Sequence, residues 1–199
     1  MKRRKFLEIS TKGGLAAGAA PVILTNSNWR GANDRVNVAV IGIRGQGMSH
    51  VREYQALDNV EVTALCDVDE NLFAERLKKQ FKDKDLREPK LYTDLRKLYE
   101  DKDVDAVSIV TPNHWHTLAS IWALQAGKHV TVEKPVCHTF HEGRKLVEAA
   151  KKYKKIVQDG SEQRSNPCAQ SAVKFMNDGK LGEIYMAKGV CYKWRNTIG

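Results

Sequence analysis

The residues best suited to chemistry in this 199-residue chain form a glycine-rich turn and a lysine between an acid and a proline. The turn reads Gly42-Ile43-Arg44-Gly45-Gln46-Gly47, and Asp67 follows 20 residues after its last glycine. Glycines at this spacing let a backbone approach a pyrophosphate at a helix N-terminus. The acid that follows binds the adenosine ribose hydroxyls. The lysine stands in Glu133-Lys134-Pro135. These residues predict a dinucleotide site with a lysine nearby.

One position departs from the G-x-G-x-x-G pattern, because Arg44 replaces its second glycine. The arginine side chain must point away from the path of the pyrophosphate or contact the phosphates. The charge on Asp67 repels a 2′-phosphate and therefore favours NAD as the cofactor, with NADP as the alternative. A plain tight turn in another α/β fold is the competing interpretation.

Apolar runs and helical periodicity supply the elements that must position these residues. Strands are predicted over 36–41, 60–66, 106–110, 129–132, 156–159 and 184–192, and helices over 46–57, 94–99, 139–152 and 167–178. Two further helices follow the capping residues Asp69 and Asn113. Alternating strands and helices indicate an α/β fold with a Rossmann-type, doubly wound parallel sheet.

Local signals define several helix ends and faces. Thr139-x-x-Glu142 is a capping box, and Gly127 is expected to end the helix that Asn113 begins. One side of that helix is predicted to carry Leu118, Ile121, Trp122 and Gln125. The helix after Asp69 is predicted to group Leu72, Phe73, Leu77 and Phe81.

The polar motifs all follow predicted strands. Thr111-Pro112-Asn113-His114-Trp115-His116 follows the strand 106–110, Glu133-Lys134-Pro135 follows 129–132, and residues 160–164 follow 156–159. Ligands of open parallel sheets bind at the carboxyl ends of strands, so one crevice is expected to receive all of these residues.

Taken together, these motifs resemble the Gfo/Idh/MocA family of oxidoreductases, the relatives of glucose–fructose oxidoreductase and inositol dehydrogenase. The resemblance begins near Arg35 and rests above all on Glu133-Lys134-Pro135. It implies that Lys134 lies beside the nicotinamide and contacts the reacting hydroxyl, after a cis peptide bond to Pro135. Glu133 is expected to pair with the lysine or to orient the nicotinamide ring.

The resemblance also assigns the remaining site residues. His116 is a second candidate catalytic residue, either lining the nicotinamide side or only capping its helix. Gln163 and Arg164 occupy a segment that reaches toward substrate. The predicted cofactor-binding residues are Gly42, Ile43, Arg44, Gly45, Gln46, Gly47, Asp67, Thr111, Pro112, Asn113, His116, Glu133 and Lys134.

Three segments are expected along the chain: residues 1–30 as a signal and linker, 31–160 as the NAD(P)-binding domain, and 161–199 as a linking helix and the start of a truncated α+β domain. In the family, that second domain contributes a histidine that accepts a proton. No residue up to Gly199 matches this histidine, so the chain is expected to be a fragment. The full-length protein is expected to form homo-oligomers.

The net charge of +9 is concentrated at the start of the chain. Residues 1–30 hold six of the 33 Lys and Arg residues and one of the 24 acids, and no motif for nucleic-acid binding follows. Lys2-Arg3-Arg4-Lys5-Phe6-Leu7 and the small apolar residues after it resemble a twin-arginine signal. The twin-arginine export machinery is therefore an expected partner, and the protein is expected to be periplasmic or exported.

The four cysteines lie far apart in the sequence, without a C-x-x-C pair, so free thiols and no metal site are expected. Three functions remain open. The first is NAD(P)-dependent hydride transfer on a sugar or polyol. The second is an NAD-dependent glycoside hydrolase of the same fold, whose glycine turn resembles this one but which departs from Glu-Lys-Pro. The third is a cofactor-binding remnant without turnover.

Overall fold

The computed structural model describes residues 35–84, 86–190, 192 and 194, and it gives no side-chain placement for Glu162 and Gln163. The predicted export signal within residues 1–30 lies outside the described part of the chain. The described chain forms one unit from Val36 onward. Within it, no helix is both long and apolar enough to cross a membrane.

Six parallel strands form a single sheet in the order β3-β2-β1-β4-β5-β6. The strands are β1 (Val36–Ile41), β2 (Val60–Cys66), β3 (Lys90–Tyr92), β4 (Ala106–Ile109), β5 (His129–Val132) and β6 (Val157–Asp159). This order is that of a doubly wound fold that reverses direction between β1 and β4. The predicted Rossmann-type sheet is confirmed.

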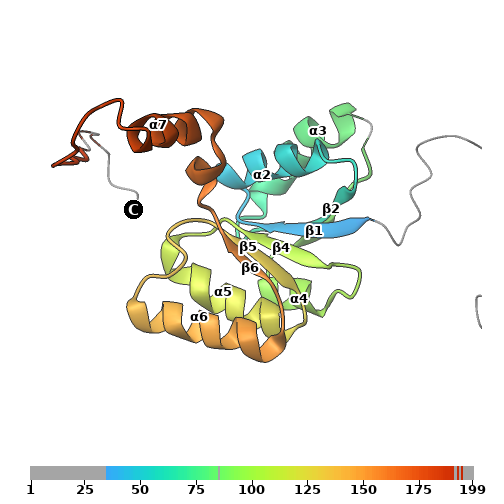
Figure 1. Cartoon of the computed structure of the whole chain (residues 1–199). Helices are drawn as coiled ribbons and strands as arrows, with labels where there is room; N and C mark the ends of the chain where they lie inside the picture. Colours follow the sequence, from blue (N-terminus) through green and yellow to red (C-terminus); the bar gives the residue numbers. More distant parts are fainter. Residues whose placement is uncertain (1–34, 85, 191, 193, 195–199) are drawn as a thin grey trace, which may run out of the picture. The chain divides into compact units, whose positions relative to one another are not determined.

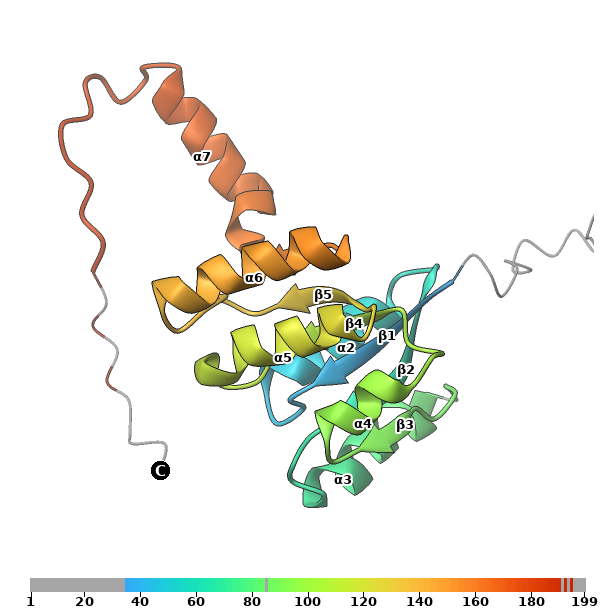
Figure 2. The same cartoon turned by 90° about the horizontal axis from the view of Figure 1, so that it is seen from below.

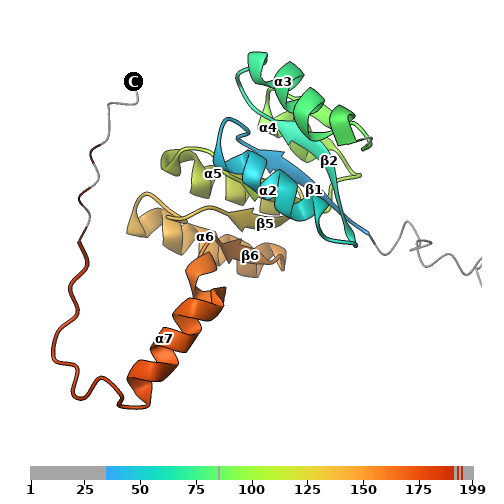
Figure 3. The same cartoon turned by 90° about the horizontal axis from the view of Figure 1, so that it is seen from above.

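Helices cover both faces of the sheet (Figure 1). The helices of the described chain are α2 (Gln46–Gln55), α3 (Asn71–Gln80), α4 (Leu95–Glu100), α5 (Asn113–Gln125), α6 (Phe140–Tyr153) and α7 (Pro167–Asn177), with short 3-10 turns η1 (Lys82–Lys84) and η2 (Glu162–Ser165). Helix α7 has no buried residue and projects away from the sheet (Figure 2). Helices α5 and α6 cover the face seen in Figure 2, and α2 and α3 cover the face seen in Figure 3.

Each face has its own apolar core. Val40, Val51 and Phe73 belong to the core under α2 and α3, whereas Ile41, Leu124 and Leu146 belong to the core under α4, α5 and α6. Strand β2 serves both cores through a bulge, because Val38 pairs with Val62 but Ala39 pairs with Ala64. The extra residue puts Val62 and Leu65 on the same face, although simple alternation places them on opposite faces.

Local chemistry sets several element ends as predicted. The hydroxyl of Thr139 accepts from the N–H of Glu142, and the Glu142 carboxylate accepts from the N–H of Thr139, which completes the capping box. Gly127 follows α5 with φ of 79°, a conformation that glycine adopts without strain. The predicted apolar face of α3 is also confirmed, since Phe73 and Phe81 are buried and Leu72 and Leu77 pack beside them.

Three local predictions are wrong, one of them in part. Helix α5 begins at Asn113 itself, with Pro112 at the N-cap, so the Asn113 side chain does not cap it. On the side predicted for α5, Ile121 and Trp122 pack beside the core, but Leu118 is 42% exposed. The buried positions of the helix are mostly small or polar residues. The described residues between 184 and 192 form no strand, since they have no partner strand in the described chain.

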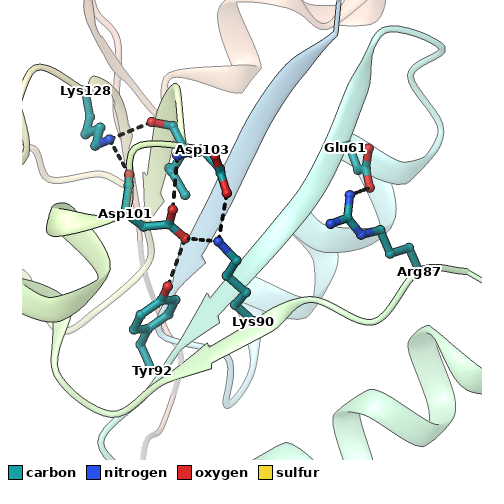
Figure 4. A network of polar contacts seen from close by, with 8 residues as sticks. Glu61, Arg87, Lys90, Tyr92, Asp101, Asp103 and Lys128 are labelled. Carbon is teal, nitrogen blue, oxygen red and sulfur yellow. Dashed lines mark hydrogen bonds and ion pairs between the residues drawn. The ribbon is translucent and has the colours of Figure 1, made fainter. Parts of the chain in front are cut away.

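Strand β3 was not among the predicted strands, and a polar network holds it to the sheet (Figure 4). Lys90 Nζ lies 2.9 Å from a carboxylate oxygen of Asp101 and 2.9 Å from one of Asp103. The Tyr92 hydroxyl donates to Asp101, and the buried Lys128 ammonium donates to the Asp101 and Val104 carbonyl oxygens. The network sits at the amino ends of the strands, opposite the predicted crevice.

These contacts control the charge of Asp101. Burial raises the pKa of this carboxyl, but hydrogen bonds from Lys90, the Asp103 N–H and Tyr92 outweigh burial and hold the pKa below its ordinary 3.8. A carboxylate whose pKa is lower in the folded state stabilises the fold above its unfolded pKa, and it loses this effect as the pH falls through its folded pKa. The contribution is therefore present at pH 6 and is lost below pH 3.8.

We expect Lys90→Met to destabilise the protein at pH 6 and to matter progressively less as the pH falls to 2.5. Urea unfolding followed by circular dichroism at several pH values measures the difference from wild type. Lys78→Met, at an exposed position on α3, is the matched control and should show no such dependence on pH. A Lys90→Met difference that stays constant from pH 6 to pH 2.5 would contradict the role of this ion pair.

Candidate functional site

The glycine turn joins β1 to α2 at the carboxyl edge of the sheet. Gly42 has φ of 89°, and a Cβ there would lie 2.7 Å from the carbonyl oxygen of Val110 on the neighbouring chain segment. A Cβ on Gly47 would collide with the carbonyl oxygen of Gly42. Two of the three turn glycines are therefore required by close backbone contacts, as in a dinucleotide-binding turn.

The first turn of α2 is arranged to receive an anion. Its N-cap residue is Gly45, which has no side chain to bond the first amides, and no acid lies in the first turn. A Cβ added to Gly45 would meet no atom within 4 Å, so the space beside the turn is open. Helix N-termini of this kind bind phosphate through free N–H groups and the helix dipole. The turn thus fits the pyrophosphate of a dinucleotide.

Asp67 is held against the glycine turn, as expected for the acid that follows the second strand. Its two carboxylate oxygens accept from the backbone N–H of Ile43 at 2.8 Å and of Asp69 at 3.0 Å. These bonds fix the carboxylate beside the turn and leave lone pairs for ribose hydroxyls. Cys66, directly before it, is buried, and burial raises the pKa of its thiol to about 12, so this thiol stays protonated.

Arg44 points along the edge of the sheet toward α3. Its guanidinium lies 2.9 Å from a carboxylate oxygen of Asp69, and 78% of its side chain is exposed. The sequence left two alternatives for this side chain: it points away from the path of the pyrophosphate, or it contacts the phosphates. In the structure the guanidinium is paired with Asp69, two residues after Asp67.

His116 joins the loops that follow β4 and β5. Its ring nitrogens lie 2.7 Å from the carbonyl oxygens of Pro135 and Thr111, and the residue is 1% exposed. Both ring nitrogens are thus placed against backbone carbonyl oxygens. The catalytic role of His116 stays a prediction, and its described contacts are those of a residue that positions the loops after β4 and β5.

Thr111 adds a second point of fit for a cofactor. Its hydroxyl oxygen is buried and has no hydrogen-bond partner within the described part of the chain. An orphaned hydroxyl at the carboxyl end of β4 is a group that a bound ligand can satisfy. Pro112 and Asn113 follow it and are exposed.

Glu133 is buried at the centre of the edge, where four elements meet. One carboxylate oxygen lies 3.0 Å from Nε2 of His50, and the other accepts from the N–H of Lys134 at 3.1 Å. Nδ1 of His50 lies 2.8 Å from the Ser108 hydroxyl. A Cβ on Gly160 would come within 3.2 Å of the same carboxylate, so the chain after β6 also closes on it.

His50 belongs to no motif in the sequence, and the structure places it at this edge of the sheet. It stands on α2, three residues after Gly47, and so links the glycine turn to Glu133. The signal in the sequence was a histidine next to the buried positions Met48 and Val51 of an amphipathic helix. Its partner is 83 residues away in the chain, which no local pattern reveals.

Lys134 is exposed at the mouth of this edge, and the peptide bond to Pro135 is cis, as predicted. The Glu133 carboxylate bonds to His50 and to the Lys134 backbone, and the lysine residue itself is exposed. Arg164 lies after β6 in η2 and is also exposed, whereas the side chain of Gln163 lies outside the described atoms.

The order of the strands, the glycine turn, Asp67 and the lysine loop together decide the family. Residues 36–161 match the family GFO_IDH_MocA, described as an oxidoreductase family with an NAD-binding Rossmann fold. The chain belongs to this family. Its cofactor is therefore NAD, and the glycine turn, Asp67 and Thr111 are the described groups that fit it.

Relatives place the match in the same part of longer proteins. A "Glycosyl hydrolase family 109 protein" of Shewanella pealeana is 35% identical over 127 residues, which are 61% of this chain and 27% of that protein. The chain thus spans little more than a quarter of the length of that relative.

Solved structures agree on the fold. Myo-inositol 2-dehydrogenase from Lactobacillus plantarum has a TM-score of 0.67 and 26% identity over 75% of this chain and 43% of that one. Scyllo-inositol dehydrogenase from Lactobacillus casei, solved with NAD(H) and scyllo-inositol, has a TM-score of 0.64 over 75% of this chain and 43% of that one. At 22% identity, the second likeness concerns the fold alone.

We expect His50→Leu to reduce the free energy of unfolding by about 2–3 kcal/mol, because it removes one of the two hydrogen-bond partners of the buried Glu133 carboxylate. The double variant His50→Leu/Glu133→Gln should recover part of this loss, since no unpaired charge remains. Urea unfolding at pH 7.5 measures all three changes of the double-mutant cycle. His141→Leu, exposed on α6, is the control. Additive effects of the two substitutions would show that His50 and Glu133 are not coupled.

Proposed function

We propose that this protein is an NAD-dependent oxidoreductase that transfers a hydride between the cofactor and a hydroxyl-bearing carbon of a sugar or polyol. The observation that carries the proposal is Lys134, exposed at the sheet edge that also holds the glycine turn and Asp67. A buried carboxylate, Glu133, fixes the backbone of this lysine. A lysine held in this way suits contact with a substrate oxygen rather than support of the fold.

The residues of the edge divide the work of binding. The N-terminus of α2 would hold the pyrophosphate, Asp67 would accept from ribose hydroxyls, and the Thr111 hydroxyl would gain a partner. When bound, a nicotinamide cofactor supplies the carbon that accepts or donates hydride. The chain itself supplies orientation, because His116 and His50 tie the loops after β4 and β5 to the helices behind them.

Proton handling falls to Lys134. As an ammonium, its Nζ donates a hydrogen bond to the substrate oxygen and polarises the C–O bond. In its neutral form, the same nitrogen accepts the hydroxyl proton as the alcohol is oxidised. Arg164 and Gln163 follow the last strand at the same edge, where a guanidinium and an amide suit binding of further hydroxyls or of an acid group on the substrate.

We expect Lys134→Met to leave NADH affinity within threefold of wild type and to lower turnover by about 100-fold or more, the usual size of a general acid–base contribution. NADH fluorescence titration measures binding to this chain. Turnover is measured with NAD and a panel of polyols on the protein purified from its source. Lys145→Met, exposed on α6, is the matched control and should behave as wild type in both assays.

The outcomes separate the competing functions. Turnover of Lys134→Met at the wild-type rate would remove the lysine from the mechanism. Release of p-nitrophenol from aryl glycosides without net NADH would favour the glycoside hydrolase whose family name the curated relatives carry. Tight NADH binding without turnover of any substrate would favour a cofactor-binding remnant.

We also propose that residues 1–30 direct export through the twin-arginine route, which moves folded, cofactor-loaded proteins to the periplasm. The support is the Arg3-Arg4-x-Phe-Leu sequence before a small apolar stretch. Replacing both arginines by lysine should retain the protein in the cytoplasmic fraction. Native mass spectrometry of the periplasmic fraction compares the subunit mass with the 22.4 kDa of this chain, which tests removal of the signal. The same spectra count the subunits of the expected homo-oligomer. Export of the Lys-Lys variant at the wild-type level would refute the route.

A further inference from the structure

The end of β5 carries a buried carboxylate in the second half of the sheet. A doubly wound dinucleotide fold consists of two mononucleotide-binding halves, which meet where the strand order reverses, here between β1 and β4. The glycine turn and Asp67 belong to the half formed by β1, β2 and β3, which receives the adenosine end. Glu133 directly follows β5 in the other half and is only 7% exposed. Its charge therefore belongs to the half that receives the nicotinamide end.

The hydrogen-bond partners of Glu133 leave its negative charge in place. One carboxylate oxygen lies 3.0 Å from Nε2 of His50, and the other accepts from the Lys134 N–H. A carboxylate only accepts, so Nε2 carries the hydrogen of that bond. Nδ1 lies 2.8 Å from the Ser108 hydroxyl, which donates as well as accepts. A neutral imidazole therefore satisfies both contacts, and it brings no positive charge to the carboxylate.

The surroundings of this pair keep water and other ions away from it. The side chains of His50 and Glu133 are 12% and 10% exposed, and Ser108 is fully buried. A Cβ on Gly160 would come within 3.2 Å of the carboxylate, so the chain after β6 closes against it. In the part of the chain that the structure describes, no lysine or arginine forms an ion pair with Glu133. A charge in such a place is weakly screened and acts over several ångströms.

We propose that the Glu133 carboxylate, paired with a neutral His50, stabilises the oxidised cofactor over the reduced one and so makes bound NADH a stronger hydride donor. The nicotinamide ring of NAD⁺ carries a positive charge, and that of NADH carries none. Transfer of hydride from NADH to a carbonyl carbon, with a proton taken up by the carbonyl oxygen, leaves the ring with the charge that Glu133 attracts. The inference rests on the proposed function and deepens it, because it assigns a preference for forming the alcohol on the protein.

Binding of the two oxidation states to this chain tests the proposal without any substrate. NADH is titrated by its fluorescence, and NAD⁺ and ADP-ribose are titrated by displacement of bound NADH. In Glu133→Gln, the dissociation constant of NAD⁺ relative to that of NADH should rise about tenfold, because an attractive charge is lost. ADP-ribose, which lacks the nicotinamide, should bind within twofold of wild type. Glu53→Gln, exposed on α2, is the matched control and should leave all three constants unchanged.

Three further variants separate the charge of this pair from its support of the edge. Glu133→Asp keeps the charge and should recover most of the preference that Glu133→Gln loses. His50→Gln keeps a neutral donor beside the carboxylate, so the ratio of the NAD⁺ and NADH constants should stay within twofold of wild type. His50→Lys brings an ammonium to an unaltered Glu133, so the ratio should rise about tenfold. This last variant carries the test if Glu133→Gln no longer binds ADP-ribose.

The failures of the two proposals are distinguishable. An unchanged ratio in Glu133→Gln and His50→Lys would overturn the role of the charge and leave NAD binding and the role of Lys134 intact. Equal weakening of NAD⁺, NADH and ADP-ribose in both variants would overturn it as well, since Glu133 would then only support the edge. Tighter NAD⁺ binding relative to NADH in His50→Gln would show that His50 is charged and cancels Glu133. Wild-type protein that binds none of the three ligands would overturn the dinucleotide function together with this inference.

Discussion

The carboxyl edge of this sheet depends on how closely the backbone closes after β1. A side chain on Gly47 would occupy the position of the Gly42 carbonyl oxygen, and one on Gly42 would meet the Val110 carbonyl oxygen. Because the chain passes through this space without side chains, α2 starts directly above β1 and its N-terminus faces outward. The contacts of Asp67 with Ile43, and of Arg44 with Asp69, all follow from that position of the turn.

Two histidines extend this constraint to the other half of the edge. His50 connects α2 to the buried Glu133 carboxylate, and His116 connects the loop after β4 to the Pro135 carbonyl oxygen. Lys134 lies between these two attachments and makes neither, so its ammonium remains available at the surface. The arrangement separates the buried groups that support the edge from the exposed lysine, and this separation suits a residue that must meet a substrate oxygen.

Charge is distributed differently at the two ends of the strands. At the amino ends, Lys90, Asp101, Tyr92 and Lys128 satisfy one another and hold the short strand β3 in place. At the carboxyl ends, several groups keep unused capacity: the N-terminus of α2, the Thr111 hydroxyl and the Arg76 Nε–H. The first end therefore stabilises the fold, and the second is the end at which a ligand adds hydrogen bonds.

The sequence by itself determined the fold class, the glycine turn with its acid, the lysine loop and the capping box, because each of these depends on residues close together in the chain. The tertiary structure decided the rest. Strand β3 has three residues, too few for any periodicity, and it exists through its pairing with β2 and the ion pairs of Lys90. The buried face of α5 consists mostly of small and polar residues, which hydrophobicity alone does not select. The pairing of His50 with Glu133 joins residues 83 positions apart, and the contact exists only because parallel strands bring their carboxyl ends to one edge.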